Sequence, residues 1–362
     1  MPGPVDYSAL TSPVTSADVR AFRQAASRDP TFAGQSSAAA IVVLVFVFAI
    51  IGFIFVGFVG VIASMAVASA AEGFSLATLV SLIFPLVFVA GFVTVVVLVI
   101  RGALGGGGRW ERWYRLSGFA AANGMQFSPS DADPSYPGAI FTIGRARMAV
   151  DHLRTLADRF FDYGNFRYTT GSGKNSTTHT WGFLALSLDR TLPHMVLDSR
   201  RNNGLFGGTN LPTAFTKDQV LALEGDFNEH FTLYCPREYE RDALYVFTPD
   251  LMAHLIDEAA PFDVEIIDTW MFVYSATAFD LRQPATHQRI FRIIDTVGAK
   301  TLSQTDRYTD DRVGNAAANI VAPEGRRLRR GVSVAAIIAV VVFGLIWGWS
   351  LLADTLGALV GQ

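Results

Sequence analysis

The chain has 362 residues and a net charge of −3, with 51% hydrophobic but only 17% charged residues, whereas ordinary globular domains contain about 25% charged residues. The near-neutral balance excludes a strongly basic nucleic-acid binder, and the high apolar content excludes an intrinsically disordered chain. The single cysteine, Cys235, excludes an internal disulfide framework and a metal site built from several cysteines.

Residues 1–37 are rich in Pro, Ser, Thr and Ala and are expected to form a polar N-terminal tail. Ser16 could cap a short helix over residues 17–28, with Val19 and Phe22 near one face. Arginines beside this face would suit the inner leaflet of a membrane, and a partly ordered tail is the simpler interpretation.

Two long apolar runs follow, within residues 41–65 and 76–100. Each is long enough to cross about 30 Å of hydrocarbon as a helix, so residues 38–100 predict a transmembrane helical hairpin. An alternative is a cleaved signal peptide ending at residues 68–70, but a signal sequence has a shorter apolar core of about 7–15 residues.

A third span is predicted within residues 331–353, followed by a short external tail at 354–362. Small residues spaced four apart allow close helix packing, within one three-helix unit or between copies. The candidate packing positions are Gly60, Ser64, Ala68, Gly344 and Gly348.

Arginines flank the predicted spans on one side. By the positive-inside rule, this places the N-terminus and residues 101–330 in the cytoplasm and the C-terminus outside, in the inner (plasma) membrane. These arginines could also bind anionic lipid headgroups. The candidate residues are Arg101, Arg109, Arg112, Arg326, Arg327, Arg329 and Arg330.

Residues 101–124 predict a linker and then a juxtamembrane helix over 109–123, which carries Trp110, Trp113 and Tyr114 on one face. This aromatic face could rest on headgroups, pack on the following domain, or do both.

Residues 125–300 predict one α+β domain with a mostly antiparallel sheet and late helices, and residues 301–330 a basic linker. Strands are expected at 139–143, 160–170, 177–189, 194–198, 230–235, 243–247, 264–267 and 270–275. Helices are expected after Thr248-Pro249 and after Pro284.

Residues 230–274, with their aromatic strand, polar turn and Thr248-Pro249, resemble bacterial membrane proteins grouped as a domain of unknown function. The segment Thr178-His179-Thr180-Trp181 is similar to the same relatives. The resemblance implies an N-terminal membrane hairpin with a cytoplasmic α+β domain. It implies no activity, and the third span departs from the simplest members.

No motif specifies a reaction. The segment 171–178 resembles a phosphate-binding loop, but Tyr168 and Asn175 stand where that motif needs Gly and Ser or Thr, so a hairpin tip is the better interpretation. The six histidines show no metal-binding spacing. Cys235 is expected to be a buried apolar residue rather than a nucleophile.

We therefore expect a membrane-tethered binding or regulatory module with no cofactor, no metal and no catalytic residue. Its expected partners are the lipid bilayer and other membrane proteins, and not nucleic acid. One alternative is an enzyme whose site gathers His179, His194, Asp198 and Cys235. Another is a structural subunit of a membrane complex.

Overall fold

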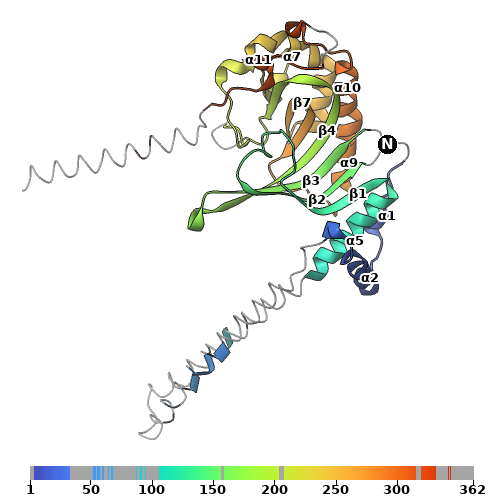
Figure 1. The fold of residues 1–362 in the computed structure, drawn as a ribbon, viewed down its shortest axis with the longest axis vertical. Coiled ribbons are helices and arrows are strands. Elements are labelled where there is room, and N and C mark those ends of the chain that lie inside the picture. Colours follow the sequence, from blue (N-terminus) through green and yellow to red (C-terminus); the bar gives the residue numbers. More distant parts are fainter. Residues whose placement is uncertain are drawn as a thin grey trace, which may run out of the picture. The chain divides into compact units, whose positions relative to one another are not determined.

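The computed structural model describes residues 4–32, 106–155, 159–203, 208–314 and 319–331, with scattered positions between 52 and 94 and at 341 and 343. The chain divides into two compact units. One consists of Met1–Ser12 and Arg115–Gln362, and the other is Pro13–Tyr114. The first unit contains the β-sheet shown in Figure 1.

In the described part of the chain, no helix has both the length and the apolar character needed to cross a membrane. The predicted class of a three-span membrane protein is therefore corrected to an antiparallel seven-stranded sheet with helices. The runs at 41–65, 76–100 and 331–353 lie almost entirely outside the described residues. A run of apolar residues has a favourable free energy of transfer from water to lipid, but this alone does not establish that the run forms one continuous helix.

The sheet is antiparallel in every pair, in the order β1-β2-β3-β4-β6-β5, with β7 also paired to β4. Its strands are β1 (Met125–Ala132), β2 (Arg145–Thr155), β3 (Phe161–Thr170), β4 (Thr177–Ser199), β5 (Val220–Leu221), β6 (Phe231–Tyr234) and β7 (Asp263–Ser275). The long strand β4 is central, because it pairs with β3, β6 and β7.

The hairpin predicted on either side of residues 171–176 is confirmed. Strands β3 and β4 pair in unbroken register from Phe161↔Leu186 to Thr170↔Thr177. Gly171 at the tip has a φ of +74°, a conformation that glycine adopts without steric cost. The lysine-containing loop is therefore a turn between strands, as the interpretation of this segment as a hairpin tip required.

The helical segments lie mostly after the sheet's first four strands. In the sheet unit they are α1 (Ser8–Thr11), α5 (Gly106–Ala122, which begins in the other unit), η2 (Gly173–Asn175), η3 (Lys217–Gln219), α6 (Phe227–His230), η4 (Arg237–Tyr239), α7 (Glu240–Val246), α8 (Pro249–His254), η5 (Leu255–Ala259), α9 (Pro284–Ile293), η6 (Ile294–Gly298), α10 (Ala299–Thr305), η7 (Asp311–Val313) and α11 (Pro323–Arg326). The predicted helices after Thr248-Pro249 and Pro284 are α8 and α9.

The two faces of the sheet are covered differently. On one face, α9 packs through Phe291 against Phe161 and Tyr163 of β3. Figure 1 shows α9 and α10 running alongside the sheet. The other face carries an aromatic cluster, covered by loop residues of 136–143 and by Leu211, Phe215 and Leu328. Strand β7 contributes side chains to both faces of the sheet, because successive side chains along a strand point to opposite faces.

Two local predictions of strands are wrong. Residues 139–143 form turns rather than a strand, with the Phe141 amide donating to the Gly138 carbonyl at 3.0 Å. Residues 243–247 lie mainly in helix α7, where Ala243 and Val246 are buried three positions apart. A short apolar run is compatible with both the two-residue period of a strand and the 3.6-residue period of a helix. The sequence of these two segments therefore did not distinguish a strand from a helix or a turn.

In the second unit, α2 (Ser16–Ala26) begins one residue before the predicted helix, and η1 (Pro30–Phe32) follows it. Thr15, rather than Ser16, caps α2 in a reciprocal capping box with Asp18. Phe22 of α2 makes edge contacts with Trp110 and Tyr114 of α5. The aromatic face of the predicted juxtamembrane helix therefore packs against protein within this unit.

Candidate ligand-binding cleft

The candidate site is built on the neighbouring strands β4 and β7. Val196 of β4 lies opposite Glu265 of β7, and Met195 lies opposite Ile266. His194 is two residues before Val196 and therefore projects from the same face as Glu265. This pairing brings together a histidine and a carboxylate that are 71 residues apart in the sequence.

Glu265 is almost completely buried, at 1% exposure, and accepts three hydrogen bonds. The donors are His194 Nε2 at 2.7 Å, the Tyr274 hydroxyl at 2.6 Å and the Ala139 backbone N–H at 2.7 Å. His194 donates to Oε1, and Tyr274 and Ala139 donate to Oε2, so both carboxylate oxygens of Glu265 accept hydrogen bonds. Its negative charge and burial raise the pKa of Tyr274 well above the usual value, with burial the larger cause.

The tautomer of His194 follows from its second ring nitrogen. The Leu328 backbone N–H donates to His194 Nδ1 at 3.0 Å, so Nδ1 carries no proton and Nε2 carries the proton given to Glu265. The imidazole is therefore neutral. All three donors to the Glu265 carboxylate are uncharged, and the buried negative charge has no cation in direct contact among these partners.

Gly138 makes the approach of the Ala139 amide possible. A Cβ atom at Gly138 would collide with the hydroxyl of Tyr274 and would lie 3.0 Å from the Phe272 ring. Glycine is therefore needed where the turn after β1 crosses the aromatic face of β7. The same crossing places Ala139 N–H on Glu265.

A cleft of about 180 Å³ opens beside this network. Glu265 and His194 line it together with Phe215, whose ring centroid lies 6.0 Å from that of His194. Arg327 and Arg330 also line it, as do the hydroxyl-bearing Thr142 and Thr213. Positive and negative groups thus border one small hollow.

The segment that carries both arginines is fastened to the body of the sheet unit. The Arg329 N–H donates to Gln219 Oε1 at 2.9 Å, and Gln219 Nε2 donates to the Arg329 carbonyl at 2.9 Å. Phe215 pairs with Arg330 in an antiparallel bridge, and the Gly331 amide donates to the Ala214 carbonyl at 2.8 Å. This wall of the cleft has a fixed backbone.

The histidine, aspartate and cysteine of the enzyme alternative are dispersed. His179 accepts or donates a bond with Thr170 at 2.9 Å near the hairpin tip. Asp198 accepts from Thr209 at 2.8 Å. Burial raises the pKa of the Cys235 thiol to about 12, which keeps it protonated and a poor nucleophile. Only His194 of the four borders the cleft.

A second buried histidine lies elsewhere on the sheet. His152 Nδ1 contacts Asp162 at 2.9 Å, and Tyr136 donates to the same carboxylate at 2.8 Å. Within the described residues, His152 Nε2 is buried and has no hydrogen-bond partner. His152 is 1% exposed and, unlike Glu265, is not among the residues that line the cleft.

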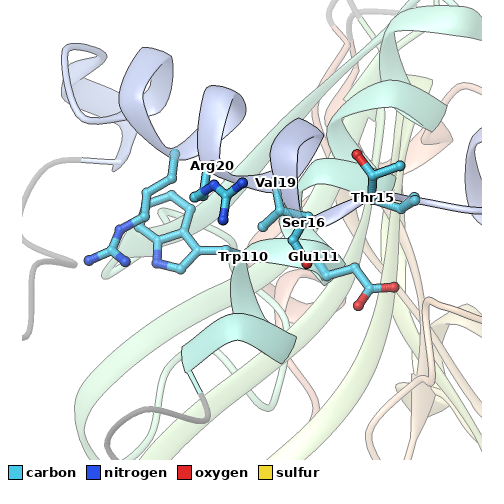
Figure 2. Close-up of a pocket in the computed structure, with 8 residues that line it drawn as sticks. Thr15, Ser16, Val19, Arg20, Trp110 and Glu111 are labelled. Atoms are coloured by element: carbon cyan, nitrogen blue, oxygen red, sulfur yellow. The ribbon is translucent and has the colours of Figure 1, made fainter.

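The second unit contains a larger pocket of about 290 Å³ between α2 and the start of α5. Figure 2 shows its lining residues, with Arg20 and Val19 on one side and Trp110 and Glu111 on the other. The guanidinium of Arg23 lies 5.5 Å from the Trp110 ring centroid, which is a cation–π geometry. Its charged groups are on open helix surfaces, in contrast to the buried Glu265.

The arginines predicted to mark topology or bind headgroups have varied surroundings. Arg109 lies 5.0 Å from the Trp113 ring centroid, and Arg112 follows it on α5. Arg326 donates to the Val321 carbonyl at 3.0 Å, and Arg329 pairs with Asp218.

Several of the predicted positions lie outside the described residues or are described only singly. Arg101, Ala68, Gly344 and Gly348 lie outside the described residues, and Gly60 and Ser64 are isolated described positions.

Sequence reasoning missed Glu265 and Tyr274. The sequence did contain a signal for Glu265, which stands between Val264 and Ile266 in a strand that is otherwise apolar. Because a charged side chain is rarely buried without a partner, a glutamate at such a position indicates a specific set of hydrogen bonds.

No protein-family model matches the chain, and no curated protein matches it. The chain is similar to the crystal structure of the mycobacterial trehalose monomycolate transport factor A, TtfA, at 12% identity. The similarity covers 57% of this chain and 96% of that chain, with a TM-score of 0.34. A likeness at this level carries no argument about the function of the present chain.

Proposed function

We propose that the sheet unit is a binding module for a small ligand with a positively charged hydrogen-bond donor, such as a primary ammonium group, which would sit against Glu265. The observation that carries this proposal is a buried carboxylate whose three hydrogen-bond donors are all neutral and which borders a cleft. Buried charges are normally paired. A cationic ligand would supply the missing charge.

The binding role is favoured over catalysis by the state of His194. A general base needs a ring nitrogen that can take a proton from a substrate. Both nitrogens of His194 are occupied, one by the Leu328 amide and the other by Glu265. The histidine therefore positions the carboxylate and fastens the cleft wall.

The first test measures binding of propylammonium to the full-length chain by saturation-transfer NMR, with propan-1-ol as the uncharged probe. We expect propylammonium, but not propan-1-ol, to bind. Glu265→Gln should weaken binding at least about tenfold, because it removes the charge. Glu224→Gln is the matched control, since Glu224 is exposed.

A second variant guards against a folding defect in Glu265→Gln. Thr213 lines the cleft and donates none of the bonds to Glu265. Thr213→Tyr should fill the cleft and abolish propylammonium binding while the Glu265 network stays intact. Equal binding of propylammonium by wild type and Thr213→Tyr, or none by wild type, would refute the proposed site.

A further inference from the structure

We propose that the ligand is a zwitterion, with a primary ammonium on Glu265 and an anionic carboxylate or phosphate on Arg330. This inference rests on the proposed function and adds a binding group for a negative charge on the same ligand. The two side chains line the same cleft with opposite charges, and no hydrogen bond or ion pair joins them in the described part of the chain. A ligand with both charges would complement both.

The two arginines of the cleft differ in what they already bind. Arg327 Nη1 and Nη2 bind the two carboxylate oxygens of Asp268, each at 2.9 Å, in a bidentate pair. Arg330 forms no side-chain hydrogen bond or ion pair with any residue that the structure describes. Its guanidinium is therefore the group that remains available to a ligand anion, which it can hold through two parallel bonds.

The position of Arg330 is set before any ligand binds. Its backbone is bridged to Phe215, and the residues on either side are held by Gln219 and by the Ala214 carbonyl. Because the backbone is already fixed, a ligand that binds here has to order only the side chain of Arg330 and not its backbone. The fixed backbone also limits how far the Arg330 guanidinium can lie from Glu265.

The remaining residues that line the cleft suit the other parts of a zwitterionic ligand. The hydroxyls of Thr142 and Thr213 have no side-chain partner within the described ranges and can donate to an anion beside Arg330. Phe215 offers an apolar surface next to His194. The cleft volume of about 180 Å³ is below the range of about 300–1,000 Å³ for sites that hold drug-sized ligands, which favours a small metabolite or headgroup.

The test compares four probes on the full-length chain by saturation-transfer NMR titration. β-Alanine and O-phosphoethanolamine carry both charges, with a carboxylate in one and a phosphate in the other. Propylammonium carries only the cation and propionate only the anion. We expect at least one zwitterion to bind about tenfold more tightly than propylammonium. The stronger of the two identifies an amino-acid-like ligand or a phosphorylated amine.

Arg330→Gln should remove this advantage, while propylammonium should still bind because Glu265 stays in place. Arg307→Gln is the matched control, since the Arg307 side chain is 91% exposed. Zwitterions that bind no more tightly than propylammonium, or an advantage that survives in Arg330→Gln, would overturn the inference while leaving the proposed function standing. Failure of propylammonium itself to bind wild type would instead refute the proposed function.

Discussion

The sheet holds two buried networks with the same three members, a tyrosine, a carboxylate and a histidine. In one, Tyr274 and His194 donate to Glu265. In the other, Tyr136 donates to Asp162, which also contacts His152. The acid and histidine of both are at most 5% exposed.

The networks differ in the second nitrogen of the histidine. His194 Nδ1 accepts the Leu328 amide from a segment 134 residues away, whereas His152 Nε2 has no partner among the described residues. The first network therefore ties the C-terminal segment to the sheet and shapes a cleft. Among the described residues, the hydrogen bonds of the second network join the neighbouring strands β2 and β3 and the loop that carries Tyr136. The two networks therefore contain the same residue types but have different roles. The second hydrogen bond of the histidine sets both its tautomer and the segment of the chain to which the network is joined.

The largest effect is expected when the carboxylate of the cleft network is removed. Glu265→Ala should lower the free energy of unfolding by about 5 kcal/mol, because three buried donors lose their acceptor at once. Chemical denaturation followed by tryptophan fluorescence would measure this loss. The matched variant Glu224→Ala, on an exposed glutamate, should change stability by less than about 0.5 kcal/mol. Similar losses in both would mean that the network is unimportant for stability.

Asp263 lies near another acid rather than a histidine, and its contribution to the stability of the fold should depend on pH. Asp263 lies beside Asp198, and burial, together with that negative neighbour, raises the pKa of Asp263 to about 7 from 3.8. The folded state binds this proton more tightly than the unfolded chain does. Its contribution to stability is therefore full below about pH 4 and is lost as pH rises through 7, by about 4 kcal/mol.

This contribution is best measured as a difference between variants, because His287 acts in the opposite direction. Burial lowers the pKa of His287 from 6.5 to about 4, so its contribution to stability is lost as pH falls through that range. The stability of Asp263→Asn relative to wild type should rise by about 4 kcal/mol between pH 4 and 8. Asp257→Asn, on an exposed aspartate, should show no such rise. A flat difference curve for Asp263→Asn would contradict the assignment.

Removing the tyrosine hydroxyl from each network sharpens the comparison directly. Tyr274→Phe should cost about 2 kcal/mol, since Tyr274 is fully buried and donates to a charged acceptor. Tyr136→Phe should cost less, about 1 kcal/mol, because Tyr136 is only partly buried and water can replace its hydroxyl. Thermal unfolding of the two variants in parallel tests the ranking. A larger loss for Tyr136→Phe would reverse it.

The smallest effect is expected at the rim of the cleft. Arg327 and Asp268 form a bidentate pair, but their side chains are 55% and 36% exposed. Exposed ion pairs contribute about 0.2–1 kcal/mol, so Arg327→Gln should lower stability by about 0.5 kcal/mol. The loss should shrink in 1 M salt, which screens exposed charges. A loss above about 2 kcal/mol would show that the pair is part of the buried network.

Local patterns in the sequence predicted much of the sheet unit. The alternating runs around residues 171–176 gave the β3–β4 hairpin, and Pro249 and Pro284 marked the starts of α8 and α9. Runs of only five residues at 139–143 and 243–247 were misassigned, because they are too short to distinguish periods of 2 and 3.6. The apolar runs were assigned to membrane spans from their length, their apolar composition and the arginines that flank them, which the described structure does not support.

Of the candidate site, His194, Arg327 and Arg330 were among the residues singled out from the sequence, the two arginines for membrane topology or headgroup binding rather than for this cleft. His194 was grouped with residues that do not line the cleft, while Glu265, Tyr274 and Ala139 were not considered as site residues. The cleft depends on the register of β4 against β7 and on a turn that crosses Tyr274 at Gly138. Neither the register nor the crossing is a local property of the chain.

The sequence by itself determined the period and turn chemistry of the antiparallel strands, because these are set by neighbours a few residues apart. It also determined that Cys235 would be a buried apolar side chain. Only the tertiary structure decided that residues 327–331 return to the sheet and that their Leu328 amide fixes the tautomer of His194. That outcome depends on contacts between segments more than a hundred residues apart, whose free energies exist only once the whole sheet has assembled.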